Sequence, residues 1–490
     1  MTDFEIFQEK AKTVNVVPVV ETLSADLLTP LAVYLKLSAD SDSSFLLESV
    51  EGGETLARYS FIGADPIFTA VGNDISVSIS NASGTTEHSV SMIRFLREHF
   101  GRFSVYQDES LPSFVGGAIG SMNFGCSSWF EPSLKRSGET DDEASMMFFR
   151  SIVAFDHAKQ VIQIISLAFT DEAEGDVEHL QSLFHSATIQ NEQIRQRLEN
   201  GAARLPERTS GFSLEQATSN WERTSFENAV TAVKELITAG EAYQVVISQC
   251  FSKPTNASPV AIYRAIRSLN PSPYMFLIKL ADKAVIGASP EMLVRVRGRD
   301  VEYRPIAGTR PRGKTADEDV RLAEEMRADR KEVAEHLMLV DLGRNDLGRV
   351  AEYGSVKVDG LMHVEKYSHV QHLVSYLSAK LRVGFDRFDA LASCFPAGTV
   401  SGAPKVRAVE IIRSLEPTVR GVYAGAVGYF DYAGNMDTCI AIRTLALEGG
   451  IAKIQAGAGI VADSIPELEY QETVNKARAM IKAVEIAEVS

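Results

Sequence analysis

The chain contains few cysteines, and their distribution excludes small cross-linked proteins. Only four cysteines occur in 490 residues, and no two of them have the spacing of a zinc site. They are also too scattered for a disulfide framework, so we expect free thiols in a reducing cytoplasm. The four are Cys126, Cys250, Cys394 and Cys439.

Basic residues are scarce relative to acidic ones. Lys and Arg number 49 against 65 Asp and Glu, which gives a formal net charge of −16. Because the sequence has no basic stripe, nucleic acid is not an expected partner. An acidic protein that binds an anion must reverse this field locally with a metal ion, an arginine or a helix N-terminus.

Long apolar runs are absent as well. The first residues, MTDFEIFQEKAKT, do not form a signal peptide, and no apolar run is long enough to cross a bilayer. A hydrophobic content of 45% and a mean hydropathy of −0.04 are typical of soluble globular proteins. We therefore expect a cytoplasmic protein with no membrane partner.

The sequence pattern changes along the chain. Residues 15–170 contain short β-like runs, such as FLLESV and QVIQIISLAF, separated by Gly, Ser, Asn and Asp. A polar stretch with a helical pattern follows, and from Trp221 onward helical and strand patterns are mixed. Because GxGxxG and P-loop motifs are missing, the pattern favours an α+β fold over a doubly wound nucleotide-binding fold.

Individual elements can be predicted in the second region. Thr224 and Glu227 form the pattern of a capping box, which predicts a helix that starts there and ends at Gly240. The alternating run 242–252 predicts a strand with Gln244 on the same face as Val246 and Ser248. We also expect helices at 320–340, 403–415 and 470–488 and strands at 423–432, 437–447 and 452–461.

Two helical segments each carry a pair of glutamates three residues apart. Glu332 and Glu335 lie among apolar residues, and Glu469 and Glu472 begin the C-terminal helix. Residues three apart share a helix face. A single pair of this kind is most often a solvated face. Four carboxylates from two helices can instead hold Mg²⁺, which prefers oxygen ligands.

The segment FPAGTVSGAPK has the features of an anion site. Thr399 and Ser401 supply hydroxyl groups, Lys405 supplies a positive charge, and the start of the next helix supplies free N–H groups. A plain helix start after a glycine turn explains the same residues equally well. Both interpretations stay open.

Four further residues near the C-terminus also have two interpretations. Gly457 and Gly459 permit close approach of a ligand or a backbone, although packing alone explains most glycines of this kind. Arg443, inside an apolar run, requires an anionic partner, either a core carboxylate or a substrate carboxylate. Lys476 is an isolated base in a helical segment.

Two residues have the chemistry for proton transfer. They are Glu291, in GASPEMLV, and His372, in SHVQHLVS. A lone histidine among apolar neighbours is more often structural, so composition alone does not assign either role.

Taken together, the motifs resemble the chorismate-utilising enzymes. GASPEMLV, PIAGTRPRG, AEHLMLVDLGRNDLGRV, VQHLVS, FPAGTVSGAPK, YAGAVGYF and QAGAGIVADSIPELEYQET occur in the order and spacing of that family. FLLESV, ARYSFIG and NPSPYMF are similar to its anthranilate synthase large-subunit branch, called component I. This resemblance implies two large β-sheets packed as a sandwich with helices outside. It also implies an N-terminal domain at 15–185, a linker at 186–220 and a catalytic domain at 221–485.

The resemblance also implies an activity and roles for residues. In that branch, chorismate loses its C4 hydroxyl as ammonia adds at C2, and pyruvate is then eliminated to leave anthranilate. Glu291 would assist departure of the hydroxyl and His372 would serve the elimination. The implied ligands of Mg²⁺ are Glu332, Glu335, Glu469 and Glu472. The implied contacts to chorismate are Thr309, Thr399, Tyr423, Arg443, Gly457, Gly459 and Lys476.

Two positions distinguish branches of the family. Enzymes that add water at C2 carry a lysine base where this chain has Gln244, because water must be deprotonated whereas ammonia is already a nucleophile. Relatives that aminate C4 carry a lysine nucleophile where this chain has Ala307. Both positions therefore favour anthranilate formation. The alternatives are an aminodeoxychorismate synthase component I, a silent small-molecule sensor on the same fold, and an unrelated metal-binding protein.

The resemblance implies partners and regulation. The run Gly125–Ser128 lacks the glycine expected after a glutaminase nucleophile, so we expect ammonia from a separate glutamine amidotransferase subunit in a hetero-oligomer. LLES and NPSPYM are similar to the segments that bind inhibitory L-tryptophan in this branch. The implied contacts are Glu48, Ser49, Pro273, Tyr274 and Met275, although each motif alone reads as ordinary structure.

Overall fold

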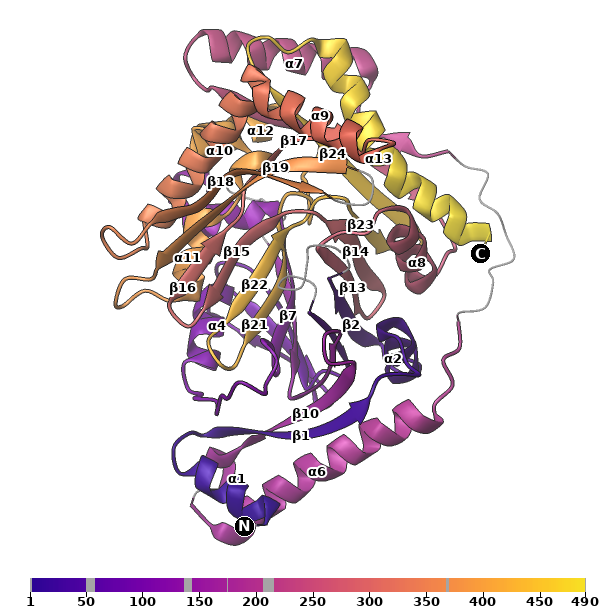
Figure 1. Ribbon diagram of the computed structural model, residues 1–490, viewed down its shortest axis with the longest axis vertical. Coiled ribbons are helices and arrows are strands. Elements are labelled where there is room, and N and C mark those ends of the chain that lie inside the picture. Colours follow the sequence, from indigo (N-terminus) through magenta and orange to yellow (C-terminus); the bar gives the residue numbers. More distant parts are fainter. Residues whose placement is uncertain are drawn as a thin grey trace.

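Two antiparallel β-sheets form the centre of the protein, and helices lie on their outer sides (Figure 1). The computed structural model describes residues 2–49, 58–135, 143–173, 175–205, 216–366 and 370–489. Within these residues each sheet has twelve strands. The predicted α+β class, with two large sheets packed as a sandwich under outer helices, is confirmed.

The first sheet, sheet A, begins with N-terminal strands and ends with C-terminal ones. Its order is β1 (Val16–Ser24), β10 (Val161–Phe169), β9 (Ser151–Asp156), β3 (Tyr59–Ala64), β2 (Ser43–Glu48), β13 (Tyr274–Leu280), β14 (Lys283–Ser289), β23 (Thr444–Glu448), β24 (Ile451–Ile460), β12 (Gln244–Pro254) and β11 (Thr218–Ser219). The short strand β20 (Gly402–Ala403) pairs with β12 beside this path.

The second sheet, sheet B, also combines strands from the N-terminal and C-terminal parts of the chain. Its order is β17 (Ile306–Pro311), β19 (Val370–Lys380), β16 (Asp300–Tyr303), β15 (Met292–Arg297), β22 (Met436–Ile440), β21 (Ala426–Asp431), β7 (Gly117–Met122), β8 (Ala144–Phe149), β4 (Phe68–Gly72), β5 (Val77–Asn81) and β6 (Gly84–His88). Strand β18 (Lys357–Lys366) pairs with β19.

Helices pack on both sheets (Figure 1). On sheet A, α6 (Val177–Asn200) contacts β10, and α13 (Pro466–Val489) contacts β24 and two further helices, α7 (Arg223–Thr238) and α8 (Pro259–Leu269). On sheet B, α9 (Ala316–Ala328) and α10 (Arg330–Gly348) contact β17 and β19. The other α-helices of the described ranges are α1 (Asp3–Ala11), α2 (Pro30–Leu37), α4 (Met92–Phe100), α5 (Ser127–Phe130), α11 (Arg387–Cys394) and α12 (Lys405–Leu415).

Aromatic side chains fill the space between the sheets. The ring centroids of Phe61 in sheet A and Tyr429 in sheet B are 6.1 Å apart, and those of Phe45 and Phe149 are 4.9 Å apart. Both pairs meet edge to face, the arrangement that aromatic quadrupoles favour. A second apolar cluster lies between sheet A and the helices α2, α8 and α13. The alternating strands of the sequence therefore bury one face in each of two layers.

Both sheets combine strands from the two ends of the chain. In sheet A, β2 pairs with β13, and in sheet B, β7 pairs with β21. Helix α6 crosses the predicted boundary between 15–185 and 186–220 without a break, so residues 186–200 are helical, as the polar pattern of this stretch predicted. The predicted ranges 15–185 and 221–485 therefore do not form separate sheets, because each range contributes strands to both sheets.

Two details of the predicted helices are wrong. Helix α7 begins at Arg223 with Glu222 as its N-cap, so Thr224 lies inside the first turn and does not cap the helix. The single helix predicted for 320–340 is two helices, because Asp329 ends α9 and begins α10. Its carboxylate accepts hydrogen bonds from the amides of Lys331 and Glu332, which is the function of an N-cap.

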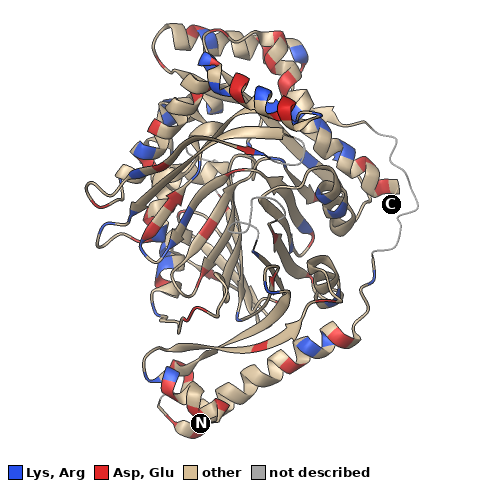
Figure 2. Cartoon of the chain, viewed as in Figure 1, with Lys and Arg blue, Asp and Glu red and all other residues tan. Residues whose placement is uncertain are grey.

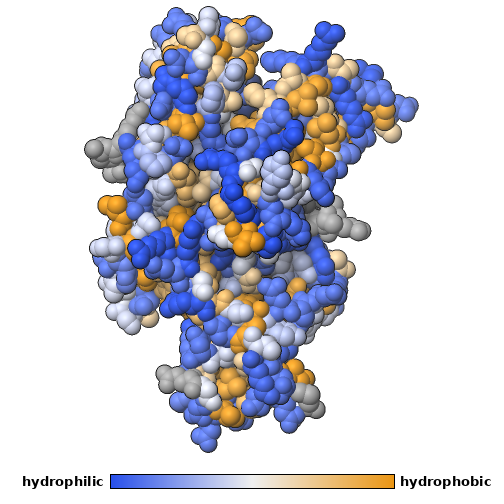
Figure 3. All heavy atoms as spheres, turned by 90° about the vertical axis from the view of Figure 1, so that its left-hand side faces the viewer, coloured by the Kyte–Doolittle hydropathy of each residue, from blue (hydrophilic) through white to orange (hydrophobic). Residues whose placement is uncertain are grey.

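The surface has a mixed charge. Acidic and basic residues alternate along the outer helices (Figure 2). Hydrophilic residues cover much of the face in Figure 3, with hydrophobic residues between them. No helix within the described residues has the length and apolar composition that a membrane span requires.

Candidate active site

The chain passes from one sheet to the other at two adjacent points. Strand β14 of sheet A leads through Pro290 and Glu291 into β15 of sheet B, and β22 of sheet B leads through Arg443 into β23 of sheet A. The Ile440 amide donates to the Glu291 carbonyl at 3.0 Å, and the Ala288 amide donates to the Arg443 carbonyl at 3.1 Å. These hydrogen bonds place Glu291 and Arg443 beside each other where the sheets meet.

Arg443 lies at a turn and not within a strand. Its φ of 49° is in the left-handed region, which few residues other than glycine adopt. The continuous strand predicted for 437–447 is therefore wrong. The apolar pattern continued across the turn because the residues on both sides of it are buried in sheets.

A cavity of about 250 Å³ opens at these crossings. It is lined by β12, β17, β19 and β24, by both crossing segments and by helices α10 and α13. It brings together most of the residues that the sequence motifs singled out. These are Gln244, Glu291, Ala307, Thr309, Glu335, His372, Thr399, Tyr423, Arg443, Gly457, Gly459 and Lys476. Glu332, Glu469 and Glu472 are not part of its wall.

Glu291 has the environment of a general acid. Its side chain is buried, and this burial raises the pKa of the carboxyl group to about 8, partly offset by the hydroxyl of Thr399. At neutral pH the carboxyl group is therefore protonated. A proton donor faces the cavity at the crossing of β14 and β15.

His372 has the environment of a neutral base. Its Nδ1 atom lies 2.9 Å from the carbonyl oxygen of Gly308 and 3.0 Å from the Thr309 hydroxyl. A carbonyl oxygen only accepts, so Nδ1 carries the proton and the lone pair lies on Nε2. Burial also lowers the pKa of the His372 ring, which keeps it neutral at pH 7.

Two basic residues give the cavity positive potential. Arg443 keeps solvent-exposed surface, and the protein atoms around its guanidinium lower the pKa of this group, which stays charged at neutral pH. Lys476 donates from Nζ to the Gly457 carbonyl at 3.0 Å and forms an ion pair with Glu472 at 2.7 Å. In a chain of net charge −16, these cations attract an anion locally.

Both glycines of β24 permit close approach by side chains. A Cβ at Gly459 would lie 2.5 Å from Nε2 of Gln244, and a Cβ at Gly457 would lie 2.7 Å from the Tyr423 hydroxyl. Burial raises the pKa of Tyr423 to about 12, so its hydroxyl remains a hydrogen-bond donor. The atoms nearest to these glycines belong to side chains of two residues that line the cavity.

The glutamate pairs of α10 and α13 influence each other electrostatically through Glu335 and Glu472. Burial raises the pKa of Glu335, and the charges of Glu332 and Glu472 raise it further. Burial also raises the pKa of Glu469, with a smaller contribution from Glu472. Like-charged carboxylates that share a site behave in this way.

As a donor set, these carboxylates suit a hard cation such as Mg²⁺. Two of them have cationic partners in this structure: Glu332 accepts from Arg310 at 2.9 Å, and Glu472 pairs with Lys476. Throughout the described ranges, no three acidic, histidine or cysteine side chains come close enough together to form a metal centre. The residue types fit the metal, and their side chains would have to adjust to hold it.

The residues expected to bind tryptophan line a second cavity, of about 100 Å³, which we call the β2–β13 cavity. Its wall includes Glu48, Ser49, Pro273, Tyr274 and Met275. Glu48 lies opposite Met275 in the pairing of β2 with β13. The Glu48 carboxylate already accepts hydrogen bonds from Tyr263 and Arg267.

Several residues of these cavities are not among the candidate residues that the sequence motifs singled out. Gln455 lines the active-site cavity and donates to Ser248 at 2.8 Å, and Arg295 and Asp437 line the β2–β13 cavity. Strand alternation contained the signal for Gln455, because residues 455, 457 and 459 share one face. The partners Arg295 and Asp437 lie on different strands, and their pairing needs the fold. Lys405, considered for an anion site, pairs with buried Asp346 at 2.9 Å and is structural.

Comparison with known proteins defines the class. The model of the chorismate binding enzyme family matches residues 43–482, and the chain belongs to this family of enzymes. It is 42% identical over 482 residues to anthranilate synthase component 1 of Acetivibrio thermocellus, covering 97% of each chain. It is 41% identical over 490 residues to anthranilate synthase component 1 of Aquifex aeolicus, covering 99% of this chain and 98% of that one. The crystal structure of anthranilate synthase component I from Streptococcus pneumoniae TIGR4 superposes with a TM-score of 0.76 at 35% identity, over 94% of this chain and 99% of that chain.

Proposed function

We propose that this enzyme converts chorismate and ammonia into anthranilate, pyruvate and water, with Mg²⁺ as its cofactor. One observation carries the proposal. Gln244 and Ala307 both line the cavity that also contains Glu291, His372 and Arg443. Neither side chain provides the lysine that water addition at C2 or amination at C4 would use.

The cavity suits a dianionic substrate. Chorismate has two carboxylates, and Arg443 and Lys476 supply the charge to bind them. Bound Mg²⁺ would supply further positive charge to one carboxylate, held by Glu332, Glu335, Glu469 and Glu472. Gly457 and Gly459 leave room on β24 for the Tyr423 hydroxyl and the Gln244 amide, which both line the cavity.

Two side chains move protons in this proposal. Glu291, protonated below about pH 8, donates its proton to the departing C4 hydroxyl, which leaves as water while ammonia bonds to C2. His372 accepts a proton through the lone pair on Nε2 as pyruvate is eliminated. Gln244 does not titrate, and its amide can donate a hydrogen bond without deprotonating the nucleophile.

Chromatography of the products tests the proposed reaction. The purified chain, supplied with chorismate, Mg²⁺ and ammonia, should release anthranilate and pyruvate in equal amounts. Isochorismate, salicylate or 4-amino-4-deoxychorismate as the main product would place the enzyme in another branch. Absence of any turnover would favour a silent sensor.

A separate glutamine amidotransferase subunit would supply the ammonia in a hetero-oligomer. The relatives' name, component 1, supports a second component. With glutamine as the only nitrogen source, the isolated chain should be inactive, and adding the amidotransferase subunit should produce anthranilate. Glutamine-dependent synthesis by the purified chain alone would contradict this part of the proposal.

L-Tryptophan would bind in the β2–β13 cavity and inhibit the formation of anthranilate. Apolar and aromatic side chains of Pro273, Tyr274 and Met275 provide a surface for an indole ring. The hydroxyl of Ser49 is buried and has no hydrogen-bond partner within the described chain, so a ligand could supply one. The Glu48 carboxylate already accepts hydrogen bonds from Tyr263 and Arg267, so the ammonium group of tryptophan would bind to it alongside these two donors.

A further inference from the structure

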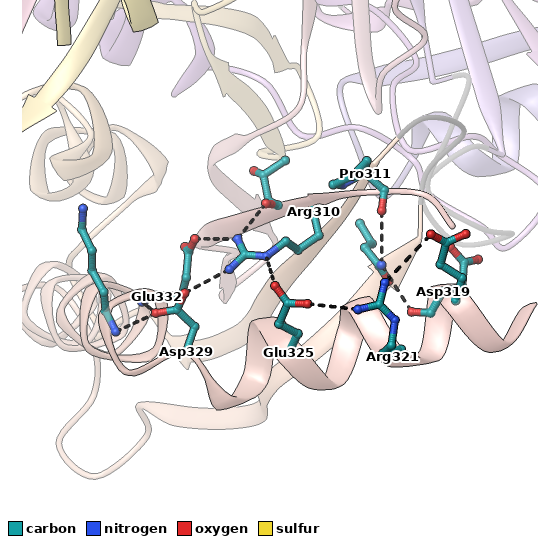
Figure 4. Close-up of polar contacts among 11 residues, drawn as sticks. Arg310, Pro311, Asp319, Arg321, Glu325, Asp329 and Glu332 are labelled. Atoms are coloured by element: carbon teal, nitrogen blue, oxygen red, sulfur yellow. Dashed lines mark hydrogen bonds and ion pairs between the residues drawn. The ribbon is translucent and has the colours of Figure 1, made fainter. Parts of the chain in front are cut away.

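Gln455, in the wall of the active-site cavity, is held by the protein at only one end of its amide group. Polar side chains nearby are paired, as Glu332 is with Arg310 at 2.9 Å (Figure 4). The Nε2 atom of Gln455 donates to the Ser248 hydroxyl at 2.8 Å, whereas its Oε1 atom accepts from no donor within the described ranges. Gln455 is only 7% exposed and lines the cavity. A nearly buried acceptor without a partner indicates a place for a ligand.

The hydrogen bonds of Ser248 determine which atom of this amide is left free. The oxygen and nitrogen atoms of an amide are assigned from the network around them. The Ser248 hydroxyl donates to Oε1 of Glu416 at 2.8 Å, because a carboxylate only accepts. The Ser248 oxygen can then only accept, and it accepts from the NH₂ group of Gln455. Turning the amide round would place two oxygen atoms against each other, so Oε1 is the free atom.

The partners behind Ser248 hold this arrangement in place. Glu416 also accepts from the Ser248 backbone amide at 2.8 Å and from Arg420 at 2.6 Å. The side chains of Glu416 and Arg420 are 4% and 1% exposed, and Arg420 donates to the Val246 carbonyl at 2.8 Å. A buried network whose members are bonded to one another keeps one orientation. The Gln455 amide is therefore oriented before any ligand arrives.

Gln455 also borders a second cavity, of about 260 Å³, which we call the inter-sheet cavity. Its wall includes residues of β7 and β8 from sheet B and of β13, β14 and β23 from sheet A. The inter-sheet cavity and the active-site cavity share Gln455 and Tyr423. A small molecule in the inter-sheet cavity would therefore meet the active site at these two side chains.

We propose that Oε1 of Gln455 binds the ammonia molecule that attacks C2 of chorismate. This inference rests on the proposed synthesis of anthranilate. The carboxylates of chorismate only accept hydrogen bonds, whereas ammonia has three N–H groups to donate. Donating one of them to Oε1 leaves the nitrogen lone pair free to bond to carbon. The hydroxyl of chorismate is the other donor that could reach this oxygen, and kinetics separates the two.

Gln249 provides a matched control on the neighbouring strand. It follows Ser248 in β12 and is fully buried. Both ends of its amide are bound, because Oε1 accepts from Ser219 at 2.7 Å and Nε2 donates to Thr473 at 2.5 Å. Among the described residues, the walls of the two cavities do not include it. Replacing Gln249 removes hydrogen bonds of the same kind without changing either cavity.

The experiment measures steady-state rates of the full-length chain with Mg²⁺, varying ammonia and chorismate in turn at a fixed pH. Gln455→Met should raise the KM for ammonia about 2–13-fold, the contribution of one hydrogen bond between neutral groups. The KM for chorismate should stay within about twofold, and kcat at saturating ammonia should be nearly unchanged. Gln249→Met should leave both KM values within about twofold, even if thermal unfolding shows that it is less stable.

Three kinetic results would overturn the inference. They are an unchanged KM for ammonia in Gln455→Met, a rise in the KM for chorismate alone, and equal changes in the Gln455 and Gln249 variants. If circular dichroism shows that Gln455→Met does not fold, Ser248→Ala decides, because it removes the partner that fixes the amide. Its KM for ammonia should rise at least about twofold, and a parental value overturns the inference. If the parent chain forms no anthranilate, the proposed function fails as well. If it forms anthranilate and only the Gln455 result is negative, the proposed function stands.

Discussion

The active-site cavity and the β2–β13 cavity lie on neighbouring strands, yet their polar groups are arranged differently. In the active site, the Glu291 carboxyl group is buried and protonated, and His372 keeps a lone pair on Nε2. In the β2–β13 cavity, Asp437 already accepts hydrogen bonds from Tyr274 at 3.1 Å and from Arg295 at 2.8 Å. The first arrangement combines a protonated acid with a neutral imidazole, whereas the second holds its charged groups in ion pairs and hydrogen bonds.

The difference indicates what each cavity can do. Perturbed acids and bases in a cavity are typical of catalysis. Satisfied ion pairs around apolar walls are typical of recognition without chemistry. Variants can test this contrast. Substitutions in the active-site cavity should lower the catalytic rate, whereas substitutions in the β2–β13 cavity should change inhibition by tryptophan or the stability of the fold.

Metal removal should have the largest effect. EDTA should abolish anthranilate formation and excess Mg²⁺ should restore it, because the carboxylates on α10 and α13 otherwise repel a dianionic substrate. Glu335→Gln should reduce the rate to a similarly low level while circular dichroism stays unchanged. Anthranilate fluorescence gives the rate in each case. Full activity without divalent metal would contradict the assignment of all four glutamates.

Removal of the proposed proton donor, Glu291, should have the second-largest effect on the rate. Glu291→Gln should lower kcat about 10²–10⁴-fold, the usual contribution of general acid–base catalysis. In the parent chain the acid is protonated below its pKa of about 8 and ionises above it. The rate at a fixed concentration of free ammonia should therefore fall as the pH rises through 8, and the residual rate of Glu291→Gln should lack this decline. A parent profile that stays flat to pH 10 would exclude Glu291 as the acid.

Tryptophan resistance should be an intermediate effect. Tryptophan should weaken chorismate binding about 5–150-fold, the usual range of coupling between two sites. Ser49→Phe or Met275→Thr should remove this inhibition and leave the uninhibited rate nearly unchanged, because both residues lie in the β2–β13 cavity. Initial rates at several tryptophan concentrations measure it. If millimolar tryptophan changes nothing in the parent chain, the cavity is only structural.

The smallest effect should be a loss of stability in the β2–β13 cavity. Tyr274→Phe removes the hydrogen bond that its hydroxyl donates to Asp437 and the longer one that it accepts from Arg295 at 3.3 Å, while Asp437 stays paired with Arg295. Hydrogen bonds to charged groups contribute about 1.5–3 kcal/mol, so the free energy of unfolding should fall by that amount. Urea unfolding measures the change, and the uninhibited rate should be unaffected. A large loss of rate would mean that the two cavities are not separate in function.

The fold and most of the site could be predicted from the sequence, but by different means. Composition and strand alternation supported an α+β protein, whereas the two-sheet sandwich and most residue roles depended on resemblance to a family. The apolar run 437–447 could not reveal a change of sheet, because both sheets bury their residues. The break at Asp329 was missed because the apolar pattern of 320–340 continues on both sides of it.

Contacts between residues that lie far apart in the sequence could mostly not be predicted. Arg310 meets Asp329 and Glu332 only because β17 packs against α10. Thr224 and Glu227 have the spacing of a capping box with Thr224 as N-cap, yet the N-cap of α7 is Glu222, two residues earlier. Local patterns therefore identified which residue types were present, and tertiary packing decided which of them act together.

The sharing of strands between the sheets has a consequence for how this chain folds. Pairing β2 with β13 and β7 with β21 joins residues more than two hundred positions apart. Such non-local contacts slow folding, because the entropy of closing long loops is lost before they form. A fragment that ends before Trp221 would also expose the edges of β2 and β7, which are sites for aggregation. Neither sheet can be completed until nearly the whole chain has been synthesised.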